Sequence, residues 1–228
     1  MELATAQDAI VRIVGDVTCT GTLIAEDLVL TAHHCVSARN DHGRVQSYDV
    51  DPSTLTIELG GDHLPWGEVN VKAIVSPDCG YAAGEGDIAI LVLSRKLIGI
   101  ATMTPRMERG PSVNEEIAPW GFGRCGARSS DAIHRVLREG GKVKAVTQGQ
   151  FLAPASICPG DSGGPALSTE GNDIVGVVSA SVMDADDRTR GASFFIRLDS
   201  WRPLFGAARE IADGASASEL PPFRSCVW

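Results

Sequence analysis

Short runs of apolar and β-branched residues recur along the whole chain, with turn-forming residues between them. Several runs alternate apolar with polar side chains, whereas Ile88 to Leu93 is apolar throughout, which predicts a strand buried on both faces. The runs that we expect as strands are residues 10–14, 28–32, 55–59, 69–75, 88–93, 142–147, 174–179 and 193–198. Because these runs do not alternate with long helices, the sequence favours an all-β barrel or sandwich over an α/β fold.

The one convincing helical pattern comes late, from Trp201 to about Ala212. Asp199 or Ser200 is the expected N-cap, because short polar side chains can accept from the first free N–H groups of a helix. Pro203 fits the first turn, and Gly214 stands just beyond the end. We therefore expect a single C-terminal helix.

The composition suits a globular protein, since 43% of the residues are hydrophobic and 21% are charged. The formal net charge is −9 and the basic residues are scattered, so we do not expect nucleic acid as a partner. No apolar run approaches the length of a membrane-spanning helix, and we expect no membrane span. The first four residues do not resemble an export signal, so such a signal has been removed or never existed.

The cysteines form an even set without a Cys-x-x-Cys pair, which indicates disulfides rather than a zinc ribbon or a thioredoxin motif. They are Cys19, Cys35, Cys79, Cys125, Cys158 and Cys226. Disulfides imply an oxidising compartment, so a secreted or periplasmic location is expected. If Met1 is the native start and the thiols are free, the protein is instead intracellular.

Residues 160–165, Gly-Asp-Ser-Gly-Gly-Pro, place Ser162 among glycines that permit a tight turn with converging backbone N–H groups. Acyl transfer needs such a turn. A serine hydroxyl is a poor nucleophile, and it requires a base, a group that orients the base, and preformed donors for the oxyanion. An ordinary glycine turn is the alternative interpretation. Ser162 is therefore the candidate nucleophile.

Two other segments offer the groups that such a serine requires. His34 follows an apolar strand and directly precedes a cysteine, and Asp87 enters a buried strand, where an unpaired carboxylate would be costly. Taken singly, a histidine at a strand end is more often structural, and Asp87 could equally be a turn or capping residue. His42, His63 and His134 have no comparable setting.

Together these segments resemble the trypsin and chymotrypsin family of serine proteases, in which His, Asp and Ser motifs follow in this order. The matching strings are residues 30–35 (LTAHHC), 86–91 (GDIAIL) and 160–165 (GDSGGP), and the resemblance spans about residues 10–212. It implies a serine endopeptidase in which Ser162 is the nucleophile, His34 the general base and Asp87 the residue that orients the base. In the family an alanine usually occupies the position of His33, so this extra imidazole could crowd or hydrogen-bond near the site.

The resemblance also implies an all-β fold: two six-stranded antiparallel β-barrels with the active site between them, plus a C-terminal helix. The expected division is a first barrel over about 1–107, a second over about 112–198, a helix over about 201–212 and a tail over 213–228. These parts would form one protease domain.

Further site residues are implied by the same resemblance. The backbone N–H groups of Gly160 and Ser162 would form the oxyanion hole, and Ser179 would lie beside the buried aspartate. Ser156 would occupy the base of the primary specificity pocket, with Ser181 and Ser193 on its walls.

A serine at the base of this pocket lacks the carboxylate that trypsin-like enzymes use to bind Lys or Arg. We therefore expect cleavage after uncharged side chains of small to medium apolar size. The opposing feature is an acidic loop with Asp184, Asp186 and Asp187, any of which could supply negative charge.

For the cysteines, the resemblance implies a Cys19–Cys35 disulfide beside the histidine loop. Cys158 lacks its usual partner, and we favour Cys125 because the corresponding family loop lies near the active-site loop. Cys79 and Cys226 then remain as the third pair, by elimination.

The family's mature amino terminus, whose freed amine pairs with the aspartate before the nucleophile, has no match here. Asp161 thus has no evident cationic partner, which puts activation of a zymogen by cleavage in doubt. The options are a truncated chain, a substitute Lys or Arg, or ordering by a partner.

Three functions remain: an active endopeptidase, a catalytically silent or partner-activated regulatory protein on a protease scaffold, and an esterase with the same acyl chemistry. We expect protein or peptide substrates, a possible protein inhibitor or activator, no cofactor, no metal and a monomer.

Overall fold

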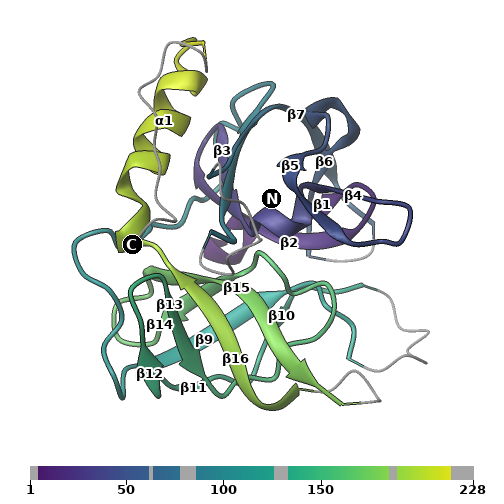
Figure 1. Ribbon diagram of the computed structural model, residues 1–228. Coiled ribbons are helices and arrows are strands. Elements are labelled where there is room, and N and C mark those ends of the chain that lie inside the picture. Colours follow the sequence, from purple (N-terminus) through teal and green to yellow (C-terminus); the bar gives the residue numbers. More distant parts are fainter. Residues whose placement is uncertain (1–4, 62–63, 78–85, 126–132, 185–188, 217–228) are drawn as a thin grey trace.

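The computed structural model describes residues 5–61, 64–77, 86–125, 133–184 and 189–216. It consists of two β units, which lie one above the other in Figure 1, and a helix, α1 (Arg202–Ala212), beside the upper unit. Within the described residues, no helix has the length and apolar character needed to cross a membrane.

The first unit is a closed six-stranded barrel with strand order β1-β2-β3-β8-β7-β6. Its strands are β1 (Ile10–Val14), β2 (Thr18–Ala25), β3 (Leu28–Thr31), β6 (Thr56–Leu59), β7 (Gly67–Val75) and β8 (Ala89–Leu93). All residues of β8 are buried, as its apolar sequence predicts, because it pairs with β3 and β7 inside the barrel wall. A separate hairpin joins β4 (Ser37–Arg39) to β5 (Val45–Asp49).

The second unit differs from the expected second six-stranded barrel. Across the described residues its sheet is open and eight-stranded, with the order β10-β9-β14-β15-β16-β13-β12 and with β11 also paired to β9. Its strands are β9 (Glu116–Gly121), β10 (Val136–Leu137), β11 (Gly141–Lys142), β12 (Ala145–Val146), β13 (Gln150–Ala153), β14 (Pro165–Ser168), β15 (Ile174–Met183) and β16 (Thr189–Arg197). The strands at its two ends, β10 and β12, have only two residues each, and each pairs with one neighbour, β9 and β13 respectively.

The run 142–147, expected as one strand, is divided between two partners. Val143 donates its N–H to the carbonyl of Glu115, beside β9, whereas Lys144 donates to Leu152 in β13. The chain therefore changes partner between these two residues, which gives β11 and β12 instead of a single strand.

The hydrophobic core runs through both units. One cluster fills the barrel, continues through Leu167, Val177 and Ile196 of the second sheet, and reaches the inner face of α1. A second cluster lies within the open sheet, where the rings of Phe151 and Phe195 stack with centroids 5.0 Å apart. The units thus pack on shared apolar side chains.

The C-terminal helix forms where it was expected, but its cap is different. Trp201 is the N-cap, whereas the expected caps have other partners. The Asp199 carboxylate accepts hydrogen bonds from Arg197 at 2.9 and 2.6 Å, and the Ser200 hydroxyl donates to the carbonyl of Gln148 at 2.7 Å. These bonds consume the groups that would have capped the helix.

Candidate active site

Two paired strands bring His34 and Asp87 together. β3 ends just before a short 3-10 turn, His33–Cys35, and it pairs with β8, which begins two residues after Asp87. His34 Nδ1 lies 2.8 Å from Asp87 Oδ2, and the His34 backbone N–H donates to Oδ1 at 2.8 Å. The register of one strand pair therefore aligns the imidazole with the carboxylate.

The Asp87 carboxylate is fully buried and has several donors around it. Besides the two groups of His34, the Ser179 hydroxyl on β15 donates to Oδ2. Such bonds offset the cost of burying a charge. A carboxylate at Nδ1 favours the tautomer with its proton on that nitrogen, and the basic lone pair then lies on Nε2.

His33 has a different partner, although it is adjacent in sequence. Its side chain is fully buried, and Nε2 lies 2.7 Å from Oδ1 of Asp49 at the end of β5. The Ser76 hydroxyl donates to the same carboxylate at 2.9 Å. His33 is thus bound on the side of the β4–β5 hairpin and is not paired with Asp87.

Thr20 on β2 holds the turn that carries Ser162. The Thr20 N–H donates to the carbonyl of Ser162 at 2.9 Å, and the Thr20 hydroxyl donates to the carbonyl of Gly160 at 2.8 Å. At Gly163, which has a φ of 82°, a Cβ atom would lie 2.1 Å from the Thr31 hydroxyl oxygen. The glycines of the turn are therefore required for its close approach to the first barrel.

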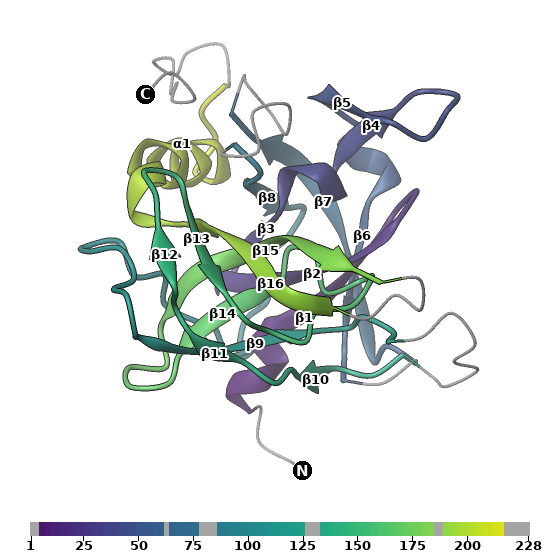
Figure 2. The same cartoon turned by 60° about the horizontal axis from the view of Figure 1, so that its bottom comes forward.

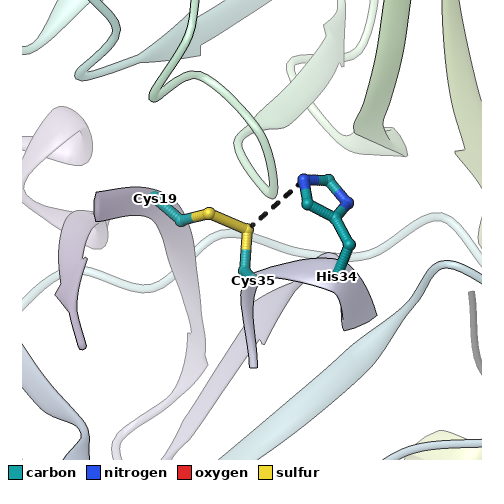
Figure 3. A group of neighbouring side chains, drawn as sticks. All are labelled: Cys19, His34 and Cys35. Atoms are coloured by element: carbon teal, nitrogen blue, oxygen red, sulfur yellow. Dashed lines mark hydrogen bonds between the residues drawn. A yellow bond between two sulfur atoms is a disulfide. The ribbon is translucent and has the colours of Figure 1, made fainter. Parts of the chain in front are cut away.

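The Cys19–Cys35 disulfide lies beside His34 (Figure 3). Cys35 Sγ is 3.9 Å from His34 Nε2 and 3.6 Å from the carbonyl oxygen of Ser162, so the imidazole and the serine backbone both lie near one sulfur atom. Potential metal-ligand atoms of the two cysteines and His34 lie within 4.8 Å of one another. While the sulfurs share a disulfide, neither is a thiolate that could bind a metal.

The backbone N–H groups of the serine turn fall into two sets, those with a protein acceptor in the described part of the chain and those without one. The N–H groups of Asp161, Gly163 and Gly164 donate to backbone carbonyls of the protein. Those of Gly160 and Ser162 have no acceptor among the described residues. These two donors are available to a substrate oxygen.

Asp161 has a cationic partner, Arg138, which follows β10. Arg138 Nε lies 2.8 Å from Oδ2, and Nη2 donates to Oδ1 at 3.0 Å. The N–H groups of Gly123 and Cys158 donate to the same carboxylate, each at 2.8 Å. Burial raises the pKa of Asp161, and the charge of Arg138 with these hydrogen bonds opposes that rise. Of the options left by the sequence, a substitute arginine is the one present.

The disulfides match the expected pairs as far as the described residues reach. Cys19 is bonded to Cys35, and Cys125 is bonded to Cys158. The second bond links the loop after β9 to the start of the serine turn. The expected pair of Cys79 with Cys226 lies outside the described residues.

The serines expected around the specificity pocket are neighbours in the second sheet. Ser181 and Ser193 face each other across β15 and β16 with their hydroxyls 2.7 Å apart, and Ser193 donates to the carbonyl of Ala155 at 3.1 Å. Ser156 lines an open pocket of about 180 Å³ next to them. Glu139 lines the same pocket, which the sequence did not suggest. In the acidic loop, Asp186 and Asp187 lie outside the described residues.

Sequence reasoning missed Thr20, Arg138 and Glu139. Thr20 lies beside Cys19 in a segment where we expected no strand, and nothing in the sequence marks its hydroxyl, which the structure buries. Arg138 and Glu139 follow a two-residue strand that has no recognisable pattern. Only the pairing of β10 with β9 brings them to the serine turn.

Comparisons with known proteins agree on one family. The family model described as Trypsin matches residues 5–204. A serine protease of Anopheles gambiae is 30% identical over 179 residues, which are 71% of this chain and 62% of that protein; the chain thus spans less than two thirds of this relative. Among solved structures, a Glu endopeptidase has a TM-score of 0.70 at 21% identity, with 93% of both chains covered. An inactivated protease paralogue of the scabies mite has a TM-score of 0.72 at 18% identity, with 96% of both covered.

Proposed function

Because this chain belongs to the trypsin family of serine proteases, we propose that it is a serine endopeptidase that acts through an acyl-enzyme intermediate. Ser162 is the nucleophile in this proposal, His34 its general base and Asp87 the group that orients the base. The observation that carries the proposal is the fully buried Asp87 carboxylate at Nδ1 of His34, because it directs the basic lone pair to Nε2.

The proposed reaction begins when His34 Nε2 takes the Ser162 hydroxyl proton as the serine oxygen attacks the substrate carbonyl. The N–H groups of Gly160 and Ser162 then bind the negative oxygen of the tetrahedral intermediate. The imidazolium returns the proton to the leaving amine, and water later hydrolyses the acyl-enzyme by the same steps. Ser179 supports these reaction steps because its hydroxyl donates to the Asp87 carboxylate and holds it in place.

The first test is Ser162→Ala. We expect the variant to lose labelling by a fluorophosphonate probe and to lose about 10⁴- to 10⁶-fold in peptide hydrolysis, as serine proteases do without their nucleophile. Ser168→Ala is the matched control, because Ser168 is another buried serine of the second sheet, on β14. Undiminished turnover in Ser162→Ala would remove this residue from the mechanism.

The alternative function is a catalytically silent or partner-activated regulatory protein, and the inactivated protease paralogue of the scabies mite shows that an inactivated protease can have this fold. Failure of the wild-type chain to react with the probe would favour this alternative. Hydrolysis of simple esters but not of peptide amides would instead favour an esterase.

We propose further that cleavage follows uncharged side chains of small to medium apolar size. Ser156 supports this, since it gives its pocket a hydroxyl where a basic side chain would need a carboxylate. Among the described residues that line this pocket, Glu139 is the one acidic side chain, and a variant of Glu139 therefore serves as the control.

The specificity proposal is tested with matched substrates that end in Ala, Val, Leu, Phe, Lys and Arg. We expect higher kcat/KM for the uncharged residues. A lead of about tenfold for Lys or Arg, which is about 1.4 kcal/mol of transition-state discrimination, would contradict the proposal. In that case Glu139→Gln would show whether this carboxylate supplies the basic preference.

The two disulfides are consistent with an oxidising compartment, and we propose a secreted or periplasmic location. The third pair, Cys79 with Cys226, stays a prediction. Protein or peptide substrates follow from the family, and a monomer with a protein inhibitor or activator remains an expectation.

A further inference from the structure

We propose that Arg138 is a positioning residue for the proposed reaction: it holds Asp161, and through Asp161 the serine turn, in the geometry that presents the oxyanion donors. This inference rests on the function proposed above. It assigns the positive charge that orders the serine turn to the Arg138 side chain.

The first argument is the position of Asp161 between the two proposed oxyanion donors, Gly160 and Ser162. The direction of their N–H groups depends on the backbone of Asp161, which is anchored by its own carboxylate. That carboxylate is completely buried, and a buried carboxylate without a cation is costly. The turn can therefore keep this conformation only if a cation remains beside Asp161.

The second argument is that Arg138, together with two backbone N–H groups, fills the space around the Asp161 carboxylate. Its guanidinium contacts both oxygens, and the N–H groups of Gly123 and Cys158 take further acceptor positions. A Cβ atom at Gly123 would lie 2.6 Å from the Asp161 side chain, so even a methyl group has no room on that side. A second cation would have to displace one of these groups.

The third argument is that Arg138 is itself fixed. Its backbone N–H donates to the carbonyl of Pro119 at 2.8 Å, and its Nη2 also donates to the carbonyl of Gly123. Its side chain is only 10% exposed. The backbone of Arg138 is thus fixed to β9, and its guanidinium joins the loop after β9 to the serine turn. The Cys125–Cys158 disulfide joins the same loop and turn nearby.

The test compares Arg138→Gln with Arg135→Gln. Arg135 precedes β10 and forms an ion pair with Asp8 at 3.1 Å, and its side chain is 12% exposed. It is therefore a similarly buried, ion-paired arginine, and its carboxylate partner, Asp8, lies outside the serine turn. We expect Arg138→Gln to lose about 10²- to 10³-fold in kcat, as enzymes do without one oxyanion donor, with KM changed less than about threefold. Arg135→Gln should keep kcat within about twofold of the wild type.

A conservative variant separates positioning from folding. Arg138→Lys keeps the charge but cannot contact both carboxylate oxygens in the same planar manner, so it should recover part of the lost kcat. If Arg138→Gln does not fold, Arg138→Lys becomes the decisive variant, with an expected kcat at least about fivefold below wild type at an unchanged Tm. A wild-type kcat in Arg138→Lys would then overturn the proposal.

Hydrogen exchange of the peptide that contains residues 158–164 gives a readout without catalysis. The proposal expects faster exchange in Arg138→Gln than in Arg135→Gln. If the wild type hydrolyses no substrate but the exchange follows this order, the proposed function fails while the role of Arg138 in the turn stands. If the wild type is active and Arg138→Gln matches Arg135→Gln in kcat and in exchange, the inference is wrong.

Discussion

His33 and His34 are adjacent in the chain, yet their imidazoles bind different carboxylates. His34 lies against Asp87, which enters the strand paired with its own, whereas His33 lies against Asp49 at the end of the β4–β5 hairpin. Both lie in the 3-10 turn after β3, where three residues complete one turn, so successive side chains point in different directions. One of the pair can therefore serve the site while the other secures a neighbouring element. The two histidines are therefore expected to fail in different ways.

We expect His34→Ala to reduce kcat by about 10⁴- to 10⁶-fold, because it removes the proposed general base. His33→Ala should change kcat less than about threefold, but should lower the free energy of unfolding by about 2–4 kcal/mol, since it leaves a cavity and removes one hydrogen-bond partner of Asp49. Active-site titration followed by kinetics gives the first quantity, and urea denaturation gives the second. The opposite ranking in kcat would show that His33 is the base.

At the scale of elements, the sequence pointed to residues of the proposed active site where they lie in continuous strings. The segments 30–35, 86–91 and 160–165 each carry their own signal, because a catalytic group there is flanked by residues that the local turn or strand requires. The apolar pattern of both runs predicts two strands. The structure pairs these strands, β3 and β8, and so brings His34 and Asp87 together.

The parts that sequence reasoning could not place depend on pairing over long distances. Arg138 is one of 20 basic residues, and nothing around it marks a site. It reaches Asp161 because the two-residue β10 pairs with the end of β9. The open edge of the second sheet was not predictable for the same reason, since strands of two residues leave almost no pattern in a sequence.

At the scale of the whole molecule, the proposed active site needs both units. His34 and Asp87 belong to the first barrel, whereas Ser162 and Ser179 belong to the second sheet (Figure 2 shows both units from a different side). The helix α1 follows the second sheet in sequence but packs against β8, β7 and β3 of the barrel. The chain thus crosses back to the first unit, and the helix ties the two halves together.

Leu204 gives a direct test of this tie. It is fully buried on the inner face of α1, and Arg209 on the same helix forms an ion pair with Asp27 of the first unit at 3.1 Å. We expect Leu204→Ala to lower the free energy of unfolding by about 2–5 kcal/mol, because it removes a large side chain from the shared core. The folded variant should keep its kcat, since the helix does not contact the serine turn.

The measurement follows circular dichroism and fluorophosphonate labelling in the same urea series. If the helix makes the two units cooperative, both signals should be lost in one transition, at a lower urea concentration in Leu204→Ala than in the wild type. Glu210→Ala is the control, because Glu210 is exposed on the same helix and should shift the midpoint little. Equal midpoints for the two variants would show that α1 does not stabilise the barrel. Separate transitions for the two signals would show that the units unfold independently.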